Sequence, residues 1–345
     1  MEQSNLRKDM NLMKMKKIIN APENLVVETL KGYIAAHSDI IQMVPGTHIV
    51  ERIVPKEKGK VRFLMANGAG HEPAVICWAG KGMFDMNIPG EIFTCASSAN
   101  IYEGIKRLGA DGSPVLVAIQ NHAGDVLNAG LAIEDALNDG IDVHSVLFWD
   151  DIASAPKQEI QERRGIGGML FYSKIIGALA EEGASVDELI FMFEQVRDRT
   201  RTLAFAVTNC TNPISGLDMF AQLPEDMIEI GMGVHGEGGS ERIKIPTAKE
   251  LAMIVADKLI EDGEYEAGDQ MLVMVNGSGA MTMMEMSIIF GELKVYLEEK
   301  GMKIVGCKVG NYLTTQELNG ASISFCAVND DMLALWCAPC EVSYF

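Results

Sequence analysis

A single histidine stands among five glycines in GMGVHGEGG, residues 231–239. Glycine adds no side-chain bulk, so we expect the imidazole of His235 to be approachable from many directions. A neutral imidazole is a nucleophile and can add to an electrophilic carbon when access is open. The motif therefore favours covalent chemistry at His235, although many histidines in proteins only pack against neighbours or cap a helix.

A second candidate is the loop NGAGHEP, residues 67–73, which follows the strand-like run KVRFLMA. Gly68 and Gly70 would let the backbone approach a ligand closely, and amides after a strand can hold an oxygen-rich group. His71 would then stand at the carboxyl end of a strand, where a general acid or base is useful, but loop histidines are common. The loop is no dinucleotide fingerprint, because Pro73 replaces the third glycine, and the chain has no GxxxxGK[ST] phosphate loop.

A carboxylate follows a third strand-like run, SPVLVAIQ, in the loop NHAGD. Asp125 is expected at the start of a helix, where an aspartate is often only a cap. The alternative is a base at the mouth of the same sheet as His71, ready to take a hydroxyl proton. Gln120 and His122 flank it, and the pattern leaves both interpretations open.

Two adjacent arginines, Arg163 and Arg164, precede glycines that open a helix in ERRGIGG. Solvated arginines are the ordinary case, but a basic pair beside a helix N-terminus is a plausible place to meet a phosphate. One close cysteine pair, Cys337 and Cys340, has no second pair at metal-ligand spacing. We therefore predict two ordinary thiols and no metal site.

The composition favours a soluble globular protein, with 48% hydrophobic and 22% charged residues. A net charge of −19 argues against nucleic acid or an anionic membrane as the main partner. The N-terminus has no apolar core of the secretory type, and no apolar run approaches the roughly 20 residues that span a bilayer. We expect a cytoplasmic protein.

Strand-like runs alternate with helical patterns along most of the chain. This alternation predicts an α/β fold with largely parallel strands, whose ligands lie at the carboxyl ends of the strands. Helices are expected after NGAGHEP and over residues 126–140, 165–183 and 185–208, the last with a capping box of Ser185 and Glu188. The repeated pattern in RFLMANGAGHEP and MLVMVNGSGAMT indicates two packed α/β halves.

We accordingly divide the chain into three parts. Residues 1–14 form a polar lead-in, residues 15–195 an N-terminal α/β domain with the loops of His71 and Asp125, and residues 196–345 a C-terminal α/β domain with His235.

The motifs NGAGHEP, PGEIFT, NHAGDVLN, ERRG, GVHGEGG and LALWCAP stand in one order along the chain. In this order and spacing the sequence resembles the substrate-binding subunit of the dihydroxyacetone kinases, the DhaK or DAK1-domain family, from about residue 15 to the C-terminus. The resemblance implies the two-domain α/β fold of that family and a homodimer. It also implies that His235 binds a short ketose such as dihydroxyacetone as a hemiaminal.

The same resemblance assigns roles to other residues. It implies that His71 is a hydrogen-bonding acid or base, that Asp125 deprotonates the hydroxyl to be phosphorylated, and that Gly68, Ala69 and Gly70 contact the substrate. It implies no cofactor in this chain, because ADP or ATP with Mg²⁺ is bound by a separate nucleotide-carrying subunit, which a phosphotransferase-system protein rephosphorylates.

Several positions depart from the family pattern. Gln120 stands where a lysine beside the substrate is usual, Ala69 replaces a serine in the loop before His71, and Cys337 replaces an aspartate in LALWCAP. Loss of a cation near the transferred phosphoryl group is expected to lower turnover. Three hypotheses follow: a dihydroxyacetone kinase subunit, a kinase for another ketose such as erythrulose, and a ketose-sensing paralogue that acts as co-activator of a transcription regulator.

Overall fold

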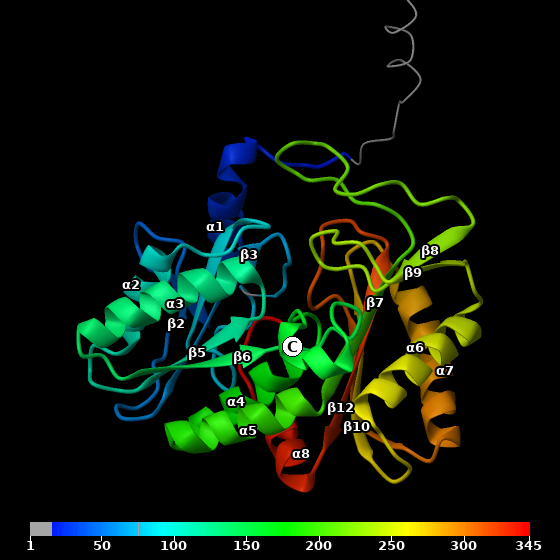
Figure 1. Ribbon diagram of the computed structural model, residues 1–345. Coiled ribbons are helices and arrows are strands. Elements are labelled where there is room, and N and C mark those ends of the chain that lie inside the picture. Colours follow the sequence, from blue (N-terminus) through cyan, green and yellow to red (C-terminus); the bar gives the residue numbers. More distant parts are fainter. Residues whose placement is uncertain (1–15, 75) are drawn as a thin grey trace, which may run out of the picture.

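The computed structural model describes residues 16–74 and 76–345, and it consists of two six-stranded sheets with helices packed against both (Figure 1). The predicted lead-in of residues 1–14 lies outside the described residues. This α/β architecture of two sheets and packed helices agrees with the fold class expected from the sequence.

The first sheet has the strand order β1-β2-β4-β3-β5-β6. Its four strands from β3 to β6 are parallel, and β1 and β2 form an antiparallel edge. The strands are β1 (Ile41–Met43), β2 (Val50–Arg52), β3 (Arg62–Ala69), β4 (Met86–Ile92), β5 (Val115–Gln120) and β6 (Val143–Phe148). The loops that follow β3 and β5 therefore leave the same edge of this sheet, as parallel strands require.

The second sheet has the order β11-β10-β12-β7-β8-β9 and is mainly antiparallel. Only β10 and β11 pair in parallel, so the expectation of largely parallel strands is wrong for this half. The strands are β7 (Thr200–Ala206), β8 (Met227–Ile230), β9 (Glu241–Lys244), β10 (Gln270–Gly277), β11 (Lys303–Gly310) and β12 (Gly320–Val328). Direct connections between neighbouring strands, such as β8 to β9, allow antiparallel pairing without a crossover helix.

Helices cover both sheets and also lie between them (Figure 1). Helices α2 and α3 pack on one face of the first sheet, and α6 and α7 pack on the second sheet. Helices α4, α5 and α8 join both sheets in one apolar core, which contains Phe63 of β3 and Met274 of β10. The helices are α1 (Leu25–Ala36), α2 (Ser98–Leu108), α3 (Ala123–Asn138), α4 (Met169–Glu182), α5 (Val186–Asp198), α6 (Ala248–Gly263), α7 (Met283–Glu299) and α8 (Asp330–Cys337), with short 3-10 turns at Pro22–Asn24 and Lys157–Glu162.

Local sequence signals explain several helix ends. The capping box of Ser185 and Glu188 begins α5 as predicted. That helix does not run on to residue 208, because the chain enters the buried strand β7 at Thr200. The helix expected after NGAGHEP is also absent from the described residues that follow the loop; the chain makes turns there and buries Trp78 and Phe84.

The end of the chain returns to the first half of the molecule. Helix α8 packs against α4, and Glu341 pairs through its backbone with Lys81. The strands of the first sheet end at Phe148 and those of the second begin at Thr200. Because the C-terminal segment packs on the first half, the predicted domain division between residues 195 and 196 stays a prediction. None of the helices in residues 16–74 and 76–345 combines the length and apolar character needed to cross a membrane.

Candidate active site

Three loops from the two sheets bring their histidines together. His71 follows β3, His122 precedes α3, and His235 lies in the turn after β8. The His235 ring centroid is 5.0 Å from that of His71 and 5.3 Å from that of His122. With Glu237, which contacts His235, these residues form what we call the histidine cluster. Two sheets that share one core therefore position a single polar site.

His71 is held in one tautomer by the backbone. Its ring is 2% exposed, and its Nδ1 lies 2.7 Å from the carbonyl oxygen of Thr314. A carbonyl oxygen only accepts hydrogen bonds, so Nδ1–H donates and Nε2 carries the lone pair. Burial, followed by the charge of His235, lowers the pKa of His71 to about 3. At neutral pH this ring is uncharged and accepts hydrogen bonds at Nε2.

His235 presents its Nε2 to this lone pair, at 3.1 Å from Nε2 of His71. Its Nδ1 lies 3.2 Å from Oε1 of Glu237, whose other oxygen accepts a hydrogen bond from the backbone N–H of His235 at 2.9 Å. The carboxylate favours the tautomer of His235 that carries its proton on Nδ1. In this tautomer the Nε2 lone pairs of His235 and His71 face each other with no proton between them, so the Nε2 lone pair of His235 becomes available to react when the two rings move apart.

The glycine-rich turn does not leave His235 open on all sides. The rings of His71, His122 and Phe93 lie beside it, and its side chain is 28% exposed. The expectation of access from many directions is therefore wrong. The glycines remove bulk along the chain, but loops distant in sequence fill much of that space. Gly236 adopts φ +81°, a left-handed conformation that favours glycine in this turn.

Glu237 is a site residue that sequence reasoning missed. Burial would raise the pKa of its carboxyl, but the hydrogen bond and the charge of His235 outweigh burial, and the net pKa falls below the usual range. The spacing of Glu237 two residues after the histidine in GVHGEGG was the available signal. It therefore acts as an anion that orients the imidazole.

His122, noted in the sequence only as a neighbour of Asp125, is the second missed residue. Its Nε2 lies 2.9 Å from the carbonyl oxygen of Gly165, so Nε2–H donates and Nδ1 carries the lone pair. Burial, followed by the charge of His235, lowers its pKa to about 4. Nothing in the spacing of NHAGD indicates that its ring meets His235.

Asp125 lies in the first turn of α3 and is 7% exposed. The capping position of that helix belongs to His122, so Asp125 does not occupy it. Burial raises the pKa of Asp125 to about 7, although the charge of His235 and a backbone amide act in the opposite direction. A carboxyl group with this pKa can exchange a proton near neutral pH.

The loop before His71 uses its own amides internally. The N–H of Gly68 donates to Oδ1 of Asn67, and the N–H of Gly70 donates to Oε1 of Glu72. Gly70 adopts φ +100° against the ring of Phe93, which a side chain at this position would disturb. Substrate contact by Gly68, Ala69 and Gly70 stays a prediction.

The side chain of Gln120 faces the interior, and its backbone carbonyl accepts a hydrogen bond from the N–H of His122 at 2.8 Å. It is 1% exposed, and its Nε2 donates to Sδ of Met169 at 2.7 Å. Its Oε1 has no hydrogen-bond partner among the described residues. This oxygen lies against Gly165, whose carbonyl oxygen accepts the hydrogen bond from His122. Its expected substrate contact stays a prediction.

The two arginines have different surroundings. Arg163 is 1% exposed and forms two hydrogen bonds, of 2.7 and 2.6 Å, with Asp262 of α6. Its guanidinium is therefore buried and satisfied within the chain, and its predicted contact with a phosphate or partner stays a prediction. Arg164 pairs with Asp151 at 2.8 Å and lies 3.5 Å from Glu237, so it reaches the edge of the histidine cluster.

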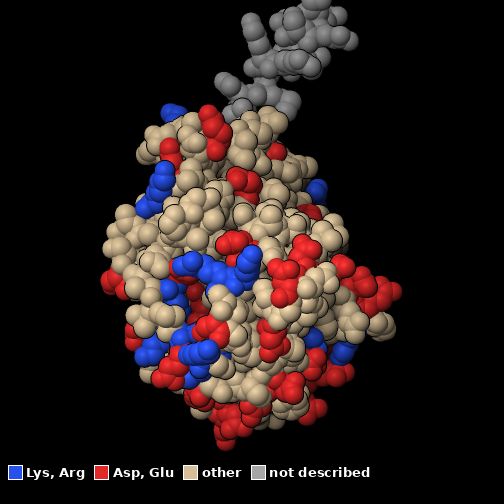
Figure 2. Space-filling view, turned by 90° about the vertical axis from the view of Figure 1, so that its left-hand side faces the viewer, with Lys and Arg blue, Asp and Glu red and all other residues tan. Residues whose placement is uncertain are grey.

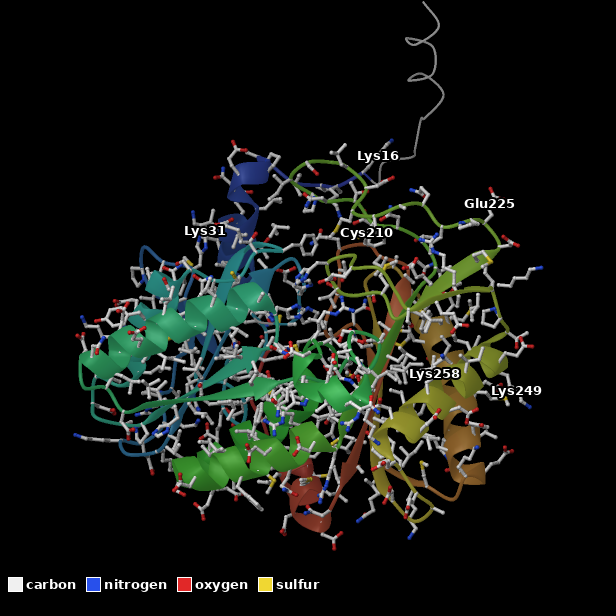
Figure 3. The ribbon with its side chains drawn as sticks, in the orientation of Figure 1. Lys16, Lys31, Cys210, Glu225, Lys249 and Lys258 are labelled. Atoms are coloured by element: carbon white, nitrogen blue, oxygen red, sulfur yellow. The ribbon has the colours of Figure 1, made fainter. Side chains whose placement is uncertain are left out.

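The segment between β7 and β8 lies beside the site. Cys210 and Glu225 mark this segment in Figure 3. Cys210 packs in a small apolar cluster with Met232, three residues before His235. This packing supports the turn that carries the histidine.

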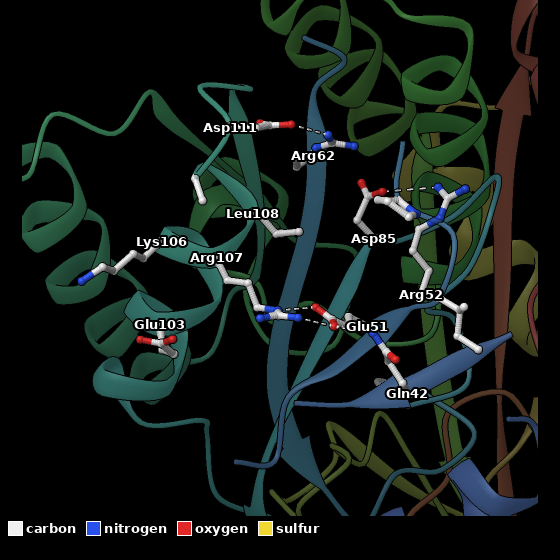
Figure 4. A pocket seen from close by; sticks show the side chains of 13 residues that line it. Gln42, Glu51, Arg52, Arg62, Asp85, Glu103, Lys106, Arg107, Leu108 and Asp111 are labelled. Atoms are coloured by element: carbon white, nitrogen blue, oxygen red, sulfur yellow. Dashed lines mark hydrogen bonds and ion pairs between the residues drawn. The ribbon is translucent and has the colours of Figure 1, made fainter. Parts of the chain in front are cut away.

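A separate hollow lies at the β1–β2 edge of the first sheet (Figure 4). Its three arginines are already paired, Arg107 with Glu51, Arg62 with Asp111, and Arg52 with Asp85 and Glu181, whereas Lys106 forms no ion pair with the described residues. Basic and acidic side chains also lie next to one another on this side of the surface (Figure 2). The hollow therefore offers no concentrated positive charge for an anion.

Comparisons with known proteins identify the family of the chain. The Dak1 domain model matches residues 31–344. The chain is 37% identical, over 93% of its length and 98% of the relative, to the dihydroxyacetone-binding subunit DhaK of PTS-dependent dihydroxyacetone kinase 1 from Listeria innocua. It is 32% identical, over 94% of its length and 57% of the relative, to the L-erythrulose 1-kinase of Mycolicibacterium smegmatis.

Solved structures give the same result. The structure of a dihydroxyacetone kinase operon co-activator, DhaQ, superposes with a TM-score of 0.85 and 30% identity over 91% of this chain and 96% of that one. The dihydroxyacetone kinase of C. freundii superposes with a TM-score of 0.84 and 26% identity over 96% of this chain and 60% of that one. From the extent of the family match and the identity to its relatives, we conclude that the chain belongs to the Dak1 domain family.

Proposed function

We propose that this chain is the ketose-binding subunit of a dihydroxyacetone kinase. His235 captures a short ketose, and a separate subunit carrying ADP or ATP with Mg²⁺ transfers the phosphoryl group. The observation that carries this proposal is the orientation of His235, whose Nδ1 contacts Glu237 and whose Nε2 faces the cluster. The named dihydroxyacetone-binding relative supports the choice of substrate.

Capture begins when the Nε2 lone pair attacks the ketone carbon. A carbon–nitrogen bond forms, the carbonyl π pair moves to oxygen, and the oxygen takes one proton from solvent to give a hemiaminal. The ring gains positive charge, which the Glu237 carboxylate at Nδ1 offsets. Glycerol has no carbonyl carbon and cannot form this bond, so selectivity follows from the chemistry.

Two further residues serve the bound ketose. His71 accepts a hydrogen bond from a substrate hydroxyl at Nε2, because its Nδ1–H is committed to Thr314. Asp125 takes the proton of the hydroxyl to be phosphorylated, and its pKa of about 7 suits a base that works near neutral pH. On this proposal residues 15–195 supply the base and residues 196–345 supply the nucleophile, in each chain of a homodimer.

The test uses dihydroxyacetone labelled with ¹³C at the ketone carbon. With the parent protein its NMR signal should move from the carbonyl region to that of a tetrahedral carbon. His235→Ala should lose this signal, whereas His144→Ala, which changes an exposed histidine on β6, should keep it. Unchanged capture by His235→Ala would overturn the covalent role.

A second function has its own support. Gln120 provides no cation near the site, and the solved co-activator shares the fold at 30% identity. A sensor needs capture but no phosphoryl transfer. Turnover of dihydroxyacetone and erythrulose with a nucleotide-carrying subunit, for the parent and for Gln120→Lys, separates the alternatives. Capture without turnover in either protein would favour the sensor.

A further inference from the structure

The histidine cluster contains the ligand set of a metal site. Within residues 16–74 and 76–345, His122, His235 and Glu237 form a group whose ligand atoms all lie within 4.8 Å of one another. They come from two loops on different sheets, so their approach is a product of the tertiary structure. Two imidazoles and one carboxylate are ligands that Zn²⁺ prefers, and three protein ligands leave a fourth position for water.

The distances suit an ion of this size. Zinc binds nitrogen and oxygen at about 2.0–2.2 Å, so two ligand atoms of a tetrahedral site lie about 3.4 Å apart. The three groups therefore need to converge by at most about 1.4 Å from their upper separation of 4.8 Å. Small rotations of the half-exposed side chains of His235 and Glu237 can supply such a movement.

The hydrogen bonds prepare His122 as a ligand. Its Nε2–H donates to the carbonyl of Gly165 at 2.9 Å, which leaves the Nδ1 lone pair free. Metal-binding histidines almost always donate their second ring N–H to a carbonyl, carboxylate or water in this way, which fixes the tautomer and the ring orientation.

The third ligand supplies negative charge. Glu237 is an anion held by the His235 side chain and backbone, and Arg164 lies 3.5 Å from one of its oxygens. An entering dication would replace the hydrogen bond between Glu237 and Nδ1 of His235 or bind the carboxylate from the other side. The net charge of −19 attracts cations to the chain as a whole.

We propose that His122, His235 and Glu237 bind a divalent transition-metal ion, with Zn²⁺ as the representative ion, and that this ion excludes ketose from the site. The exclusion follows because an ion on either ring nitrogen of His235 removes the Nε2 lone pair that the ketone carbon needs: an ion on Nε2 uses that lone pair directly, and an ion on Nδ1 leaves the ring proton on Nε2. The exclusion rests on the proposed function, whereas metal binding does not. The ion would act as an inhibitor and takes no part in phosphoryl transfer.

Calorimetric titration with Zn²⁺ tests the site directly. The parent should bind one ion per chain tightly, and His122→Phe should weaken this site by about 100-fold or more, since loss of an outer partner alone costs about 10- to 100-fold. His144→Phe is the matched control, because His144 forms a surface pair with Asp142 at 2.9 Å. Equal affinity in the parent and His122→Phe would overturn the proposal.

Cobalt and magnesium provide a second readout. Co²⁺ should give the visible absorption of a four-coordinate ion in the parent and in His144→Phe, and lose it in His122→Phe. Mg²⁺, which prefers oxygen ligands, should not displace Co²⁺. Displacement by Mg²⁺ at similar concentrations would show binding to surface carboxylates and would overturn the site.

Competition is measured on the parent protein alone. The apparent Kd for Zn²⁺ should rise in proportion to the concentration of dihydroxyacetone, and a chelator should restore ketose capture. A Kd independent of dihydroxyacetone, with capture intact, would overturn the exclusion. A protein that binds Zn²⁺ at His122 but captures no ketose without metal would refute the proposed function and leave the metal site standing.

Discussion

Replacing Asp125 with asparagine should stop phosphorylation and at the same time stabilise the protein above pH 7. The side chain is 7% exposed, so the folded state pays for holding a charge away from water. Asparagine has a similar shape and no charge. If Asp125 is a base, the parent protein keeps this unfavourable carboxylate for its chemistry.

The size of the effect follows from the pKa. Burial raises the pKa of Asp125 from 3.8 to about 7, a difference of about three pKa units. At about 1.4 kcal/mol per unit this corresponds to about 4 kcal/mol as an upper figure. The raised pKa means that the unfolded chain releases its proton first as the pH rises, so the parent loses stability between about pH 4 and pH 7. The Asp125→Asn variant does not lose this stability. Its gain in the free energy of unfolding over the parent should therefore be near zero at pH 4 and largest above pH 7.

Urea unfolding of the parent and of Asp125→Asn, each at pH 5 and pH 8, measures this gain in the free energy of unfolding. Asp135→Asn, on the exposed side of the same helix, is the control and should show no comparable change with pH. Turnover with a nucleotide-carrying subunit and capture of labelled dihydroxyacetone are measured in parallel. A gain that does not grow with pH would refute the argument from burial, and full turnover in Asp125→Asn would refute the role as base.

Three other changes have defined outcomes. Glu237→Gln should slow ketose capture by about 10- to 100-fold, because a hydrogen bond to a charged group contributes about 1.5–3 kcal/mol; an unchanged rate in the NMR assay would contradict its role in orienting His235. Arg163→Ala should lower the free energy of unfolding by about 1.5–3 kcal/mol, because Asp262 loses its hydrogen bonds to one charged partner and keeps Arg201; unchanged urea stability would contradict this. His122→Gln should be less sensitive to acid than the parent, because the lowered pKa of about 4 makes the parent lose stability as the pH falls below about 6.5; parallel unfolding curves from pH 7 to pH 5 would contradict this.

Much of the fold was accessible from sequence because it depends on local patterns. The strand-like runs before His71 and Asp125 became β3 and β5, and the Ser185 capping box begins α5. These signals involve residues close in the chain, whose spacing decides which face of a helix or strand is apolar. The antiparallel pairing of the second sheet was missed, because pairing partners such as β7 and β12 are more than 100 residues apart.

The sequence by itself determined the class of fold, the family and the three loops that carry His71, Asp125 and His235. Only the tertiary structure decided how these loops meet. It packed rings against His235, buried Arg163 on Asp262, and placed His122 beside a histidine more than 100 residues away. The physical reason is that reactivity depends on burial, on hydrogen-bond partners and on neighbouring charge, and in this protein distant segments supply most of them.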